Sequence, residues 1–86
     1  MKYWKDFFEQ FNTQHGEFVN SISKNFPGLT MSEFKVCCLL RAGYTNPQIA
    51  EMTYSTLRAI ETTRYRLRKK LPITTTEDLV VFLMRL

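Results

Sequence analysis

The sequence lacks the long apolar run that a membrane-spanning helix requires. Its longest uninterrupted apolar stretch runs from Leu79 to Met84, whereas a helix needs roughly 18 to 20 such residues to cross a bilayer. The N-terminus, Met-Lys-Tyr-Trp-Lys-Asp, carries charges where a signal peptide would have its apolar segment. We therefore expect a cytoplasmic protein with no membrane partner.

Cysteine, histidine and glycine are also scarce. Cys37 and Cys38 are neighbours in the chain, and adjacent residues in a regular helix do not easily reach disulfide geometry. His15 is the one histidine, too few for a zinc site, and we expect it at a surface or capping position. The three glycines lie far apart, unlike those of a phosphate-binding loop. The sequence predicts no metal, no cofactor and no enzymatic activity.

The apolar residues that are present repeat with the spacing of helices. The chain has 86 residues, of which 44% are hydrophobic, enough for one small folded domain. Two aromatic-rich stripes at helical spacing come first: Trp4, Phe7, Phe8 and Phe11, then Phe18, Ile22 and Phe26. No segment has the alternation of a strand. We predict an all-α fold, with residues 1–28 as an N-terminal extension of two helices.

Capping residues place the next helix. Thr30 and Glu33 have the capping-box spacing, and Gly43 suits a left-handed C-cap, so we predict a helix from Met31 to about Ala42. Its outer face, with Cys38, needs a cover. We expect the N-terminal aromatics to supply it; the alternative is that they form an exposed docking surface.

A short helix, a turn and a longer helix follow. Thr45 and Gln48 form a second capping box, and the Thr-Tyr-Ser-Thr run at 53–56 favours a turn. The longer helix covers about 57–71 and ends before Pro72. This order is the helix-turn-helix pattern, in which the second helix enters the DNA major groove.

The longer helix carries most of the positive charge of the chain. The whole chain has a net charge of +4, whereas residues 57–71 hold six bases and one acid, a balance of +5. With Ile60 turned inward, a rotation of about 100° per residue puts bases, an acid and an aromatic on the solvent face. Such a stripe indicates a polyanionic partner, although many charged stripes are simply solvated helix faces.

Four short segments carry a family resemblance: Leu29-Thr30-Met31-Ser32-Glu33, Gly43-Tyr44-Thr45-Asn46, Ile49-Ala50-Glu51 and Lys70-Leu71. Through them, the chain from Leu29 to about Leu83 resembles the LuxR-type (GerE-type) helix-turn-helix domain, and we assign residues 29–86 to this domain. The segment 64–71, Cys37 and the lead-in at 26–30 are similar to the variant at the C-terminus of larger bacterial regulators. The resemblance implies sequence-specific binding of double-stranded DNA by a transcriptional regulator, with sensor or repeat domains upstream in a longer chain. A sigma-factor region 4-like promoter reader and a helical protein-interaction module remain as alternatives.

The resemblance also implies roles for individual residues. The base-reading positions are Glu61, Thr62 and Tyr65. The phosphate-contacting positions are Arg58, Arg66, Arg68, Lys69, Thr45 and Tyr44. Arg64 falls on the inward side, where we expect an ion pair with Glu33 or Glu51.

The turn departs from the family pattern. Thr53 and Ser55 stand where buried aliphatic residues are usual, so we expect Met52 or Tyr54 to fill the core instead.

The C-terminal segment predicts a last helix and a dimer. Thr74 and Glu77 have the spacing of a third capping box. Beyond the core stripe of this helix, further apolar residues widen its surface: Val80, Val81 and Met84. We expect this surface to pair two copies on DNA, because a two-fold dimer presents two recognition helices to one face of the duplex.

Overall fold

The computed structural model describes residues 2–86, with the backbone alone for Lys2, and this part of the chain folds into helices without a strand. The six helices are α1 (Lys2–Gln14), α2 (Gly16–Asn25), α3 (Met31–Arg41), α4 (Asn46–Met52), α5 (Leu57–Lys70) and α6 (Leu79–Arg85). The predicted all-α fold is confirmed. None of these helices combines the length and the apolar character needed to span a bilayer.

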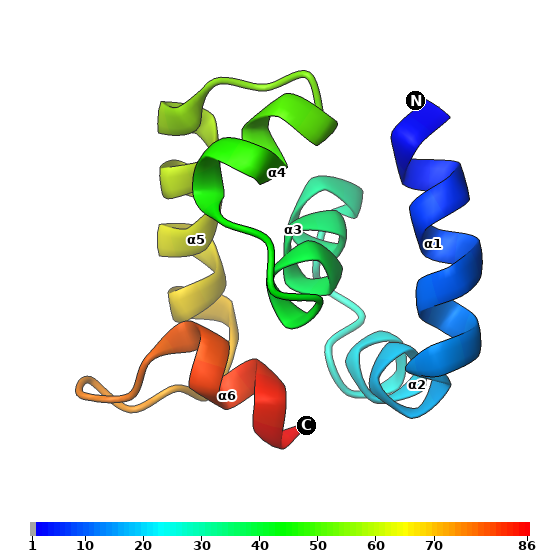
Figure 1. Ribbon diagram of the computed structural model, residues 1–86. Helices are drawn as coiled ribbons and strands as arrows, with labels where there is room; N and C mark the ends of the chain where they lie inside the picture. The colour runs from blue at the N-terminus through cyan, green and yellow to red at the C-terminus, as the bar shows by residue number, and fades with distance from the viewer. Residues whose placement is uncertain (1) are drawn as a thin grey trace.

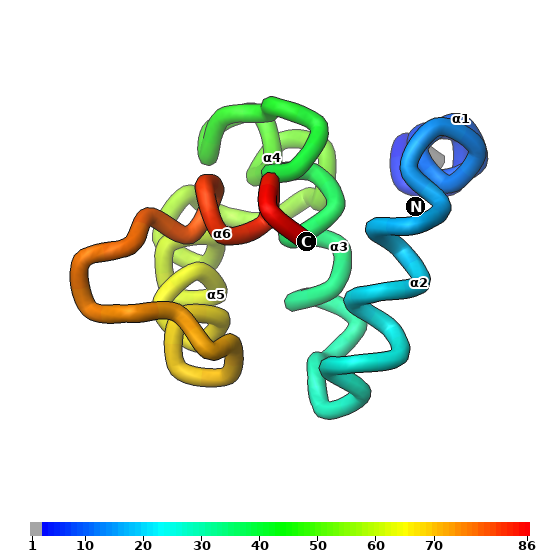
Figure 2. The backbone as a smooth tube through the Cα atoms, turned by 90° about the horizontal axis from the view of Figure 1, so that it is seen from below, coloured from blue at the N-terminus to red at the C-terminus, as the bar shows by residue number. Residues whose placement is uncertain are grey.

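Helix α3 is the centre of the fold. Helices α1 and α2 lie on one side of it, and α4, α5 and α6 lie on the other (Figures 1 and 2). Five consecutive residues of α3, from Val36 to Leu40, are buried, which requires neighbours on every face of the helix. Burial raises the pKa of the Cys37 thiol to about 12, with a smaller contribution from Glu33, so this cysteine is a neutral core residue.

The N-terminal aromatics cover the outer face of α3, as predicted. Phe11 is buried, and the rings of Trp4 and Phe8 lie 6.2 and 5.9 Å from the ring of Phe34 on α3. Cys38, on the same side, is 0% exposed. Residues of both the extension and the rest of the chain belong to one continuous hydrophobic core.

Two of the three predicted capping boxes are present. The Thr30 hydroxyl accepts from the Glu33 N–H at 3.1 Å while the Glu33 carboxylate accepts from the Thr30 N–H at 2.8 Å. Thr45 and Gln48 make the same pair of bonds at the start of α4. The left-handed Gly43 is also confirmed, with φ of 96°.

The third box, Thr74 with Glu77, is wrong. Helix α6 begins at Leu79, and its N-cap is Asp78, whose carboxylate accepts from the N–H groups of Val80 and Val81. Glu77 turns its carboxylate to Arg85 instead. Asp is as good an N-cap as Thr, so the spacing of Thr74 and Glu77 did not decide where the helix starts.

The turn between α4 and α5 closes with local bonds. The Ser55 N–H donates to the Ala50 carbonyl at 2.8 Å across Tyr54, which takes the left-handed conformation with φ of 54°. Met52 packs against the edge of the core, as one of the two expected fillers, whereas Tyr54 is 72% exposed and does not fill it.

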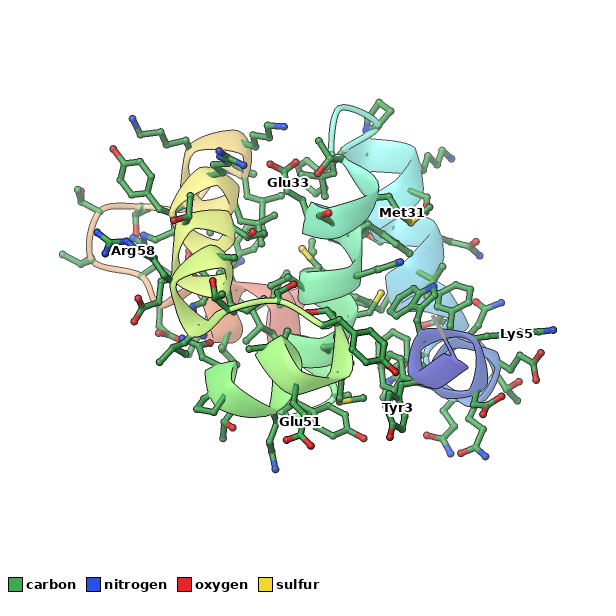
Figure 3. The ribbon with its side chains drawn as sticks, turned by 90° about the horizontal axis from the view of Figure 1, so that it is seen from above. Tyr3, Lys5, Met31, Glu33, Glu51 and Arg58 are labelled. Carbon is green, nitrogen blue, oxygen red and sulfur yellow. The ribbon has the colours of Figure 1, made fainter. Side chains whose placement is uncertain are left out.

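A single carboxylate joins α3 to the end of α5. Glu33, 3% exposed, accepts a hydrogen bond at 2.8 Å from the Lys70 ammonium as well as the one from Thr30. Figure 3 shows Glu33 between the two helices. Burial by itself would raise the pKa of this carboxyl, but the hydrogen bonds from Lys70 and Thr30 outweigh burial and lower it below 4.5.

We predict that Glu33→Gln lowers the free energy of unfolding by about 1 kcal/mol at neutral pH, because a hydrogen bond to a charged group is worth more than its neutral counterpart. A lowered folded pKa stabilises above the unfolded pKa, and this stabilisation disappears as pH falls through the folded value. The difference between wild type and variant in urea unfolding should therefore vanish in acid. Glu51→Gln, an exposed carboxylate, is the control. A difference that persists unchanged into acid would contradict this assignment.

Candidate nucleic-acid interface

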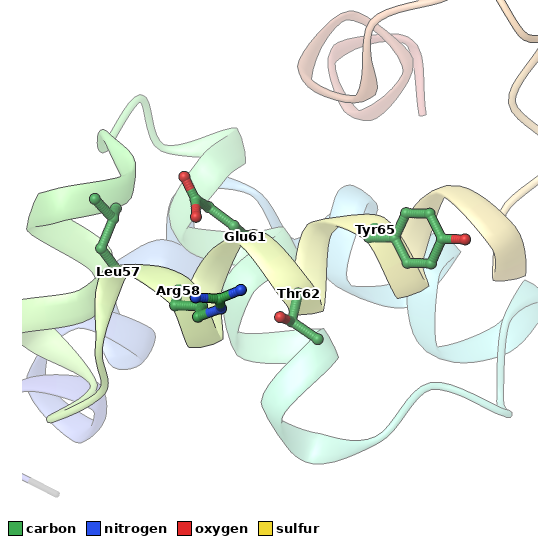
Figure 4. A pocket seen from close by; sticks show the side chains of 5 residues that line it. All are labelled: Leu57, Arg58, Glu61, Thr62 and Tyr65. Carbon is green, nitrogen blue, oxygen red and sulfur yellow. The ribbon is translucent and has the colours of Figure 1, made fainter.

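Helix α5 lies at one edge of the molecule, with one face buried and the other open. Its buried side chains, Ile60 and Leu67, are seven residues apart and pack into the core. On the opposite face, five side chains line a shallow hollow (Figure 4): Leu57, Arg58, Glu61, Thr62 and Tyr65. The structure thus brings the three predicted base-reading residues together on one exposed surface.

Leu57 is the member of this hollow that sequence reasoning missed. Its side chain is exposed although it is aliphatic. Around the helix axis, Leu57 lies about 60° from the inward-facing Ile60, at the edge of the buried face. This angle is the feature of the sequence from which its exposure could have been predicted.

Three of the six cations of α5 are held by other parts of the fold. Arg64 donates to the Asn46 side-chain oxygen at 2.9 Å, and Lys70 pairs with Glu33. Arg68 donates to three backbone carbonyls of the loop before α6, those of Glu77, Thr74 and Thr75, at 2.7, 3.3 and 3.4 Å. These side chains fix the position of α5 against α3, α4 and the loop.

The predicted ion pair of Arg64 with Glu33 or Glu51 is wrong. Neither Glu33 nor Glu51 pairs with it, because Glu33 is engaged by Lys70 and Glu51 is exposed on the outer face of α4. The bond to Asn46 instead joins the first residue of α4 to the middle of α5. It sets the angle between the two helices of the helix-turn-helix pair.

Arg68 also has a role that differs from the expected one. It was assigned to phosphate contact, but its half-buried guanidinium is directed into the loop. These bonds use three of the five N–H donors of the guanidinium and leave two for a ligand.

The other three cations of α5 are exposed. Arg58, Arg66 and Lys69 make no hydrogen bond or ion pair with any residue in the described part of the chain. The Lys69 ammonium lies 4.7 Å from the centre of the Tyr65 ring, a cation–π distance. These cations therefore share the exposed face with Glu61, Thr62 and Tyr65.

The two phosphate-contact candidates outside α5 differ in exposure. The Thr45 side chain is exposed, with its hydroxyl accepting from the Gln48 N–H. Tyr44 is half-buried, and its ring meets the ring of Phe7 edge-on at 5.9 Å. Tyr44 therefore also takes part in holding α1.

The three predicted dimer residues also differ in exposure. Val80 is half-buried against the core of its own chain, whereas Val81 and Met84 are each 53% exposed. The apolar surface left on α6 is smaller than the sequence suggested.

His15 and the acidic residues offer no metal site in residues 2–86, where no group of three or more His, Cys, Asp or Glu side chains comes together. His15 makes no capping hydrogen bond; its ring packs 4.8 Å from that of Phe11.

Comparisons with protein-family models, with curated proteins and with solved structures gave no match for this chain.

Proposed function

We propose that this protein is a sequence-specific DNA-binding domain of a bacterial transcriptional regulator that acts in the cytoplasm, with α5 in the major groove. One observation carries the proposal: the three cations of α5 that make no hydrogen bond or ion pair within the described residues are exposed beside the carboxylate, hydroxyl and phenol groups. Like charges on one helix destabilise it by a few tenths of a kcal/mol per pair. A polyanion that neutralises them offsets this cost.

The dimensions of α5 fit the groove. Its 14 residues span about 21 Å, and a helix with side chains, roughly 10 to 12 Å across, enters a major groove about 12 Å wide. Base edges there offer the cytosine amino donor to Glu61 and hydrogen-bond partners to the Thr62 hydroxyl. Leu57 can contact a thymine methyl group. Arg58, Arg66 and Lys69 reach phosphates on either side of the groove.

The alternative of a protein-interaction module rested on the aromatic residues of the N-terminal helices, on the missing aliphatic residues of the turn and on the acidic Glu61. Trp4, Phe8 and Phe11 pack against α3 and against one another, so they are already used within the domain. Tyr3 and Tyr54 form an exposed aromatic pair, with ring centroids 6.2 Å apart, outside this packed set.

We predict a steep salt dependence of DNA binding. Fluorescence anisotropy with a labelled duplex of about two helical turns should give a log–log slope near −3 per protomer, since each of the three neutralised phosphates contributes about −0.9. Arg66→Gln should reduce the slope by about one. Lys24→Gln, an exposed lysine on α2, is the control and should leave it unchanged. Absence of binding at low salt, or a slope near zero, would refute the proposal.

We predict that Tyr65→Ala and Lys69→Ala weaken DNA binding in different ways. On a duplex selected from a randomised pool, loss of the base-reading Tyr65 should cost roughly 1 to 3 kcal/mol and relax the preference at one base pair. Loss of Lys69 should weaken all sequences alike and reduce the salt slope by about one. If the two variants showed the same sequence-independent loss, the assignment of base-reading and phosphate positions would be wrong.

We also propose that two copies pair on DNA through Val81 and Met84, with Val80 at the edge of the contact. Because this apolar surface is small, the dimer should be weak in solution and form mainly on a two-fold site. Sedimentation with a duplex of roughly three helical turns should show two protomers bound for wild type and one for Met84→Glu. Met31→Glu, a methionine equally open to solvent on α3, should still bind as a pair. One wild-type protomer per duplex at saturating protein would exclude the dimer.

A further inference from the structure

The loop between α5 and α6 projects past the exposed side of α5. It covers residues 71–78 and turns at Thr75 and Thr76. Both views of the backbone show this loop, in orange, extending beyond α5 on the side away from α3 (Figures 1 and 2). Arg58, at the other end of α5, points to the same side in Figure 3. A duplex lying along the open face of α5 would therefore meet this loop.

The carbonyl groups of the loop turn inward because Arg68 binds them. Its guanidinium donates hydrogen bonds to the carbonyls of Thr74, Thr75 and Glu77. In a trans peptide the C=O of one residue points opposite to the N–H of the next. The N–H groups of Thr75, Thr76 and Asp78 are therefore directed away from Arg68, toward the outside of the loop.

These outward donors are available to a ligand. The N–H groups of Thr75 and Thr76 have no acceptor among residues 2–86, and both side chains are exposed, so two hydroxyl groups lie near them. Successive N–H groups that face outward, with hydroxyls nearby, form the kind of surface that binds a phosphate oxygen.

The acidic residues beside the loop are already paired. The Glu77 carboxylate accepts two hydrogen bonds from Arg85, and the Asp78 carboxylate caps α6. Lys69, on the last turn of α5, adds a positive charge near the start of the loop, with no anionic partner among the described residues. The tip of the loop is thus not dominated by negative charge.

We infer that the tip of this loop, Thr75 and Thr76, binds a backbone phosphate of the DNA where the C-terminal end of α5 leaves the major groove, and that Arg68 is the positioning residue that shapes it. The inference rests on the proposed DNA binding and adds to it a contact outside the helix-turn-helix. It also explains why Arg68, although it lies on a DNA-facing helix, is directed to carbonyls of its own chain.

Thr75→Glu tests the contact by placing a carboxylate where the phosphate would lie. We expect its dissociation constant for the duplex at low salt to rise roughly tenfold, the loss of one hydrogen bond to a charged group. Asn20→Glu, an exposed residue of α2, makes the same change in net charge and should shift it less than about twofold. Thermal unfolding of each variant shows whether the fold is kept.

A methylphosphonate scan of the selected duplex locates the contact. Replacing one charged phosphate at a time by a neutral methylphosphonate should weaken wild type at a position flanking the groove, and Thr75→Glu should be insensitive there. Arg68→Lys, which keeps the charge but lacks the planar guanidinium fork that spans the three carbonyls, should lose the same sensitivity while the protein stays folded. If Arg68 contacted the phosphate directly, the lysine variant would keep the sensitivity to methylphosphonate at that position, and the inference would be overturned.

The outcomes separate this inference from the proposed function. If wild type binds DNA with the expected salt slope and Thr75→Glu binds as well as Asn20→Glu, the loop contact is wrong and the DNA binding stands. If wild type binds no DNA at low salt, both are wrong.

Discussion

The fold depends on one buried carboxylate. Glu33 accepts hydrogen bonds from the Thr30 N–H at the start of α3 and from the Lys70 ammonium at the end of α5, both at 2.8 Å. A charge that is 3% exposed is tolerated only when such partners compensate its lost hydration. One partner is three residues away in the chain and the other is 37 residues away. The carboxylate that caps the start of α3 therefore also holds the C-terminal end of α5 in place against α3. The exposed face of α5 is oriented by that constraint.

The cations of α5 divide into two groups that serve different purposes. Arg64, Arg68 and Lys70 hold α4, the loop and α3, because their N–H groups donate to acceptors of the chain itself. Arg58, Arg66 and Lys69 keep their charges exposed. A rigidly held helix loses little conformational entropy when it binds, so the first group lowers the cost of using the second. The contacts that hold α5 in place and the exposed charges that are proposed to bind DNA are therefore carried by the same helix.

Local chemistry could be predicted from the sequence, and long-range pairing could not. Capping boxes at Thr30 and Thr45 depend on residues three apart, and helical periodicity placed the open face of α5 correctly. The partner of Arg64 is 18 residues away and depends on how α4 crosses α5. Nothing in the spacing of residues favours Asn46 over a carboxylate there. For Arg68, helical periodicity predicts the direction of the side chain around the helix but not the loop that it contacts.

The N-terminal helices are part of the same core as the helix-turn-helix. Phe11, Phe18 and Ile22 are fully buried, and burying one such side chain contributes about 1.5 to 3 kcal/mol. Domains of this size have a net stability of only about 5 to 15 kcal/mol. Without α1 and α2, the face of α3 that carries Phe34 and Cys38 would meet water, and α3 is the helix from which Glu33 holds α5. The open face of α5 is therefore stabilised by aromatic residues at the opposite end of the molecule, through α3.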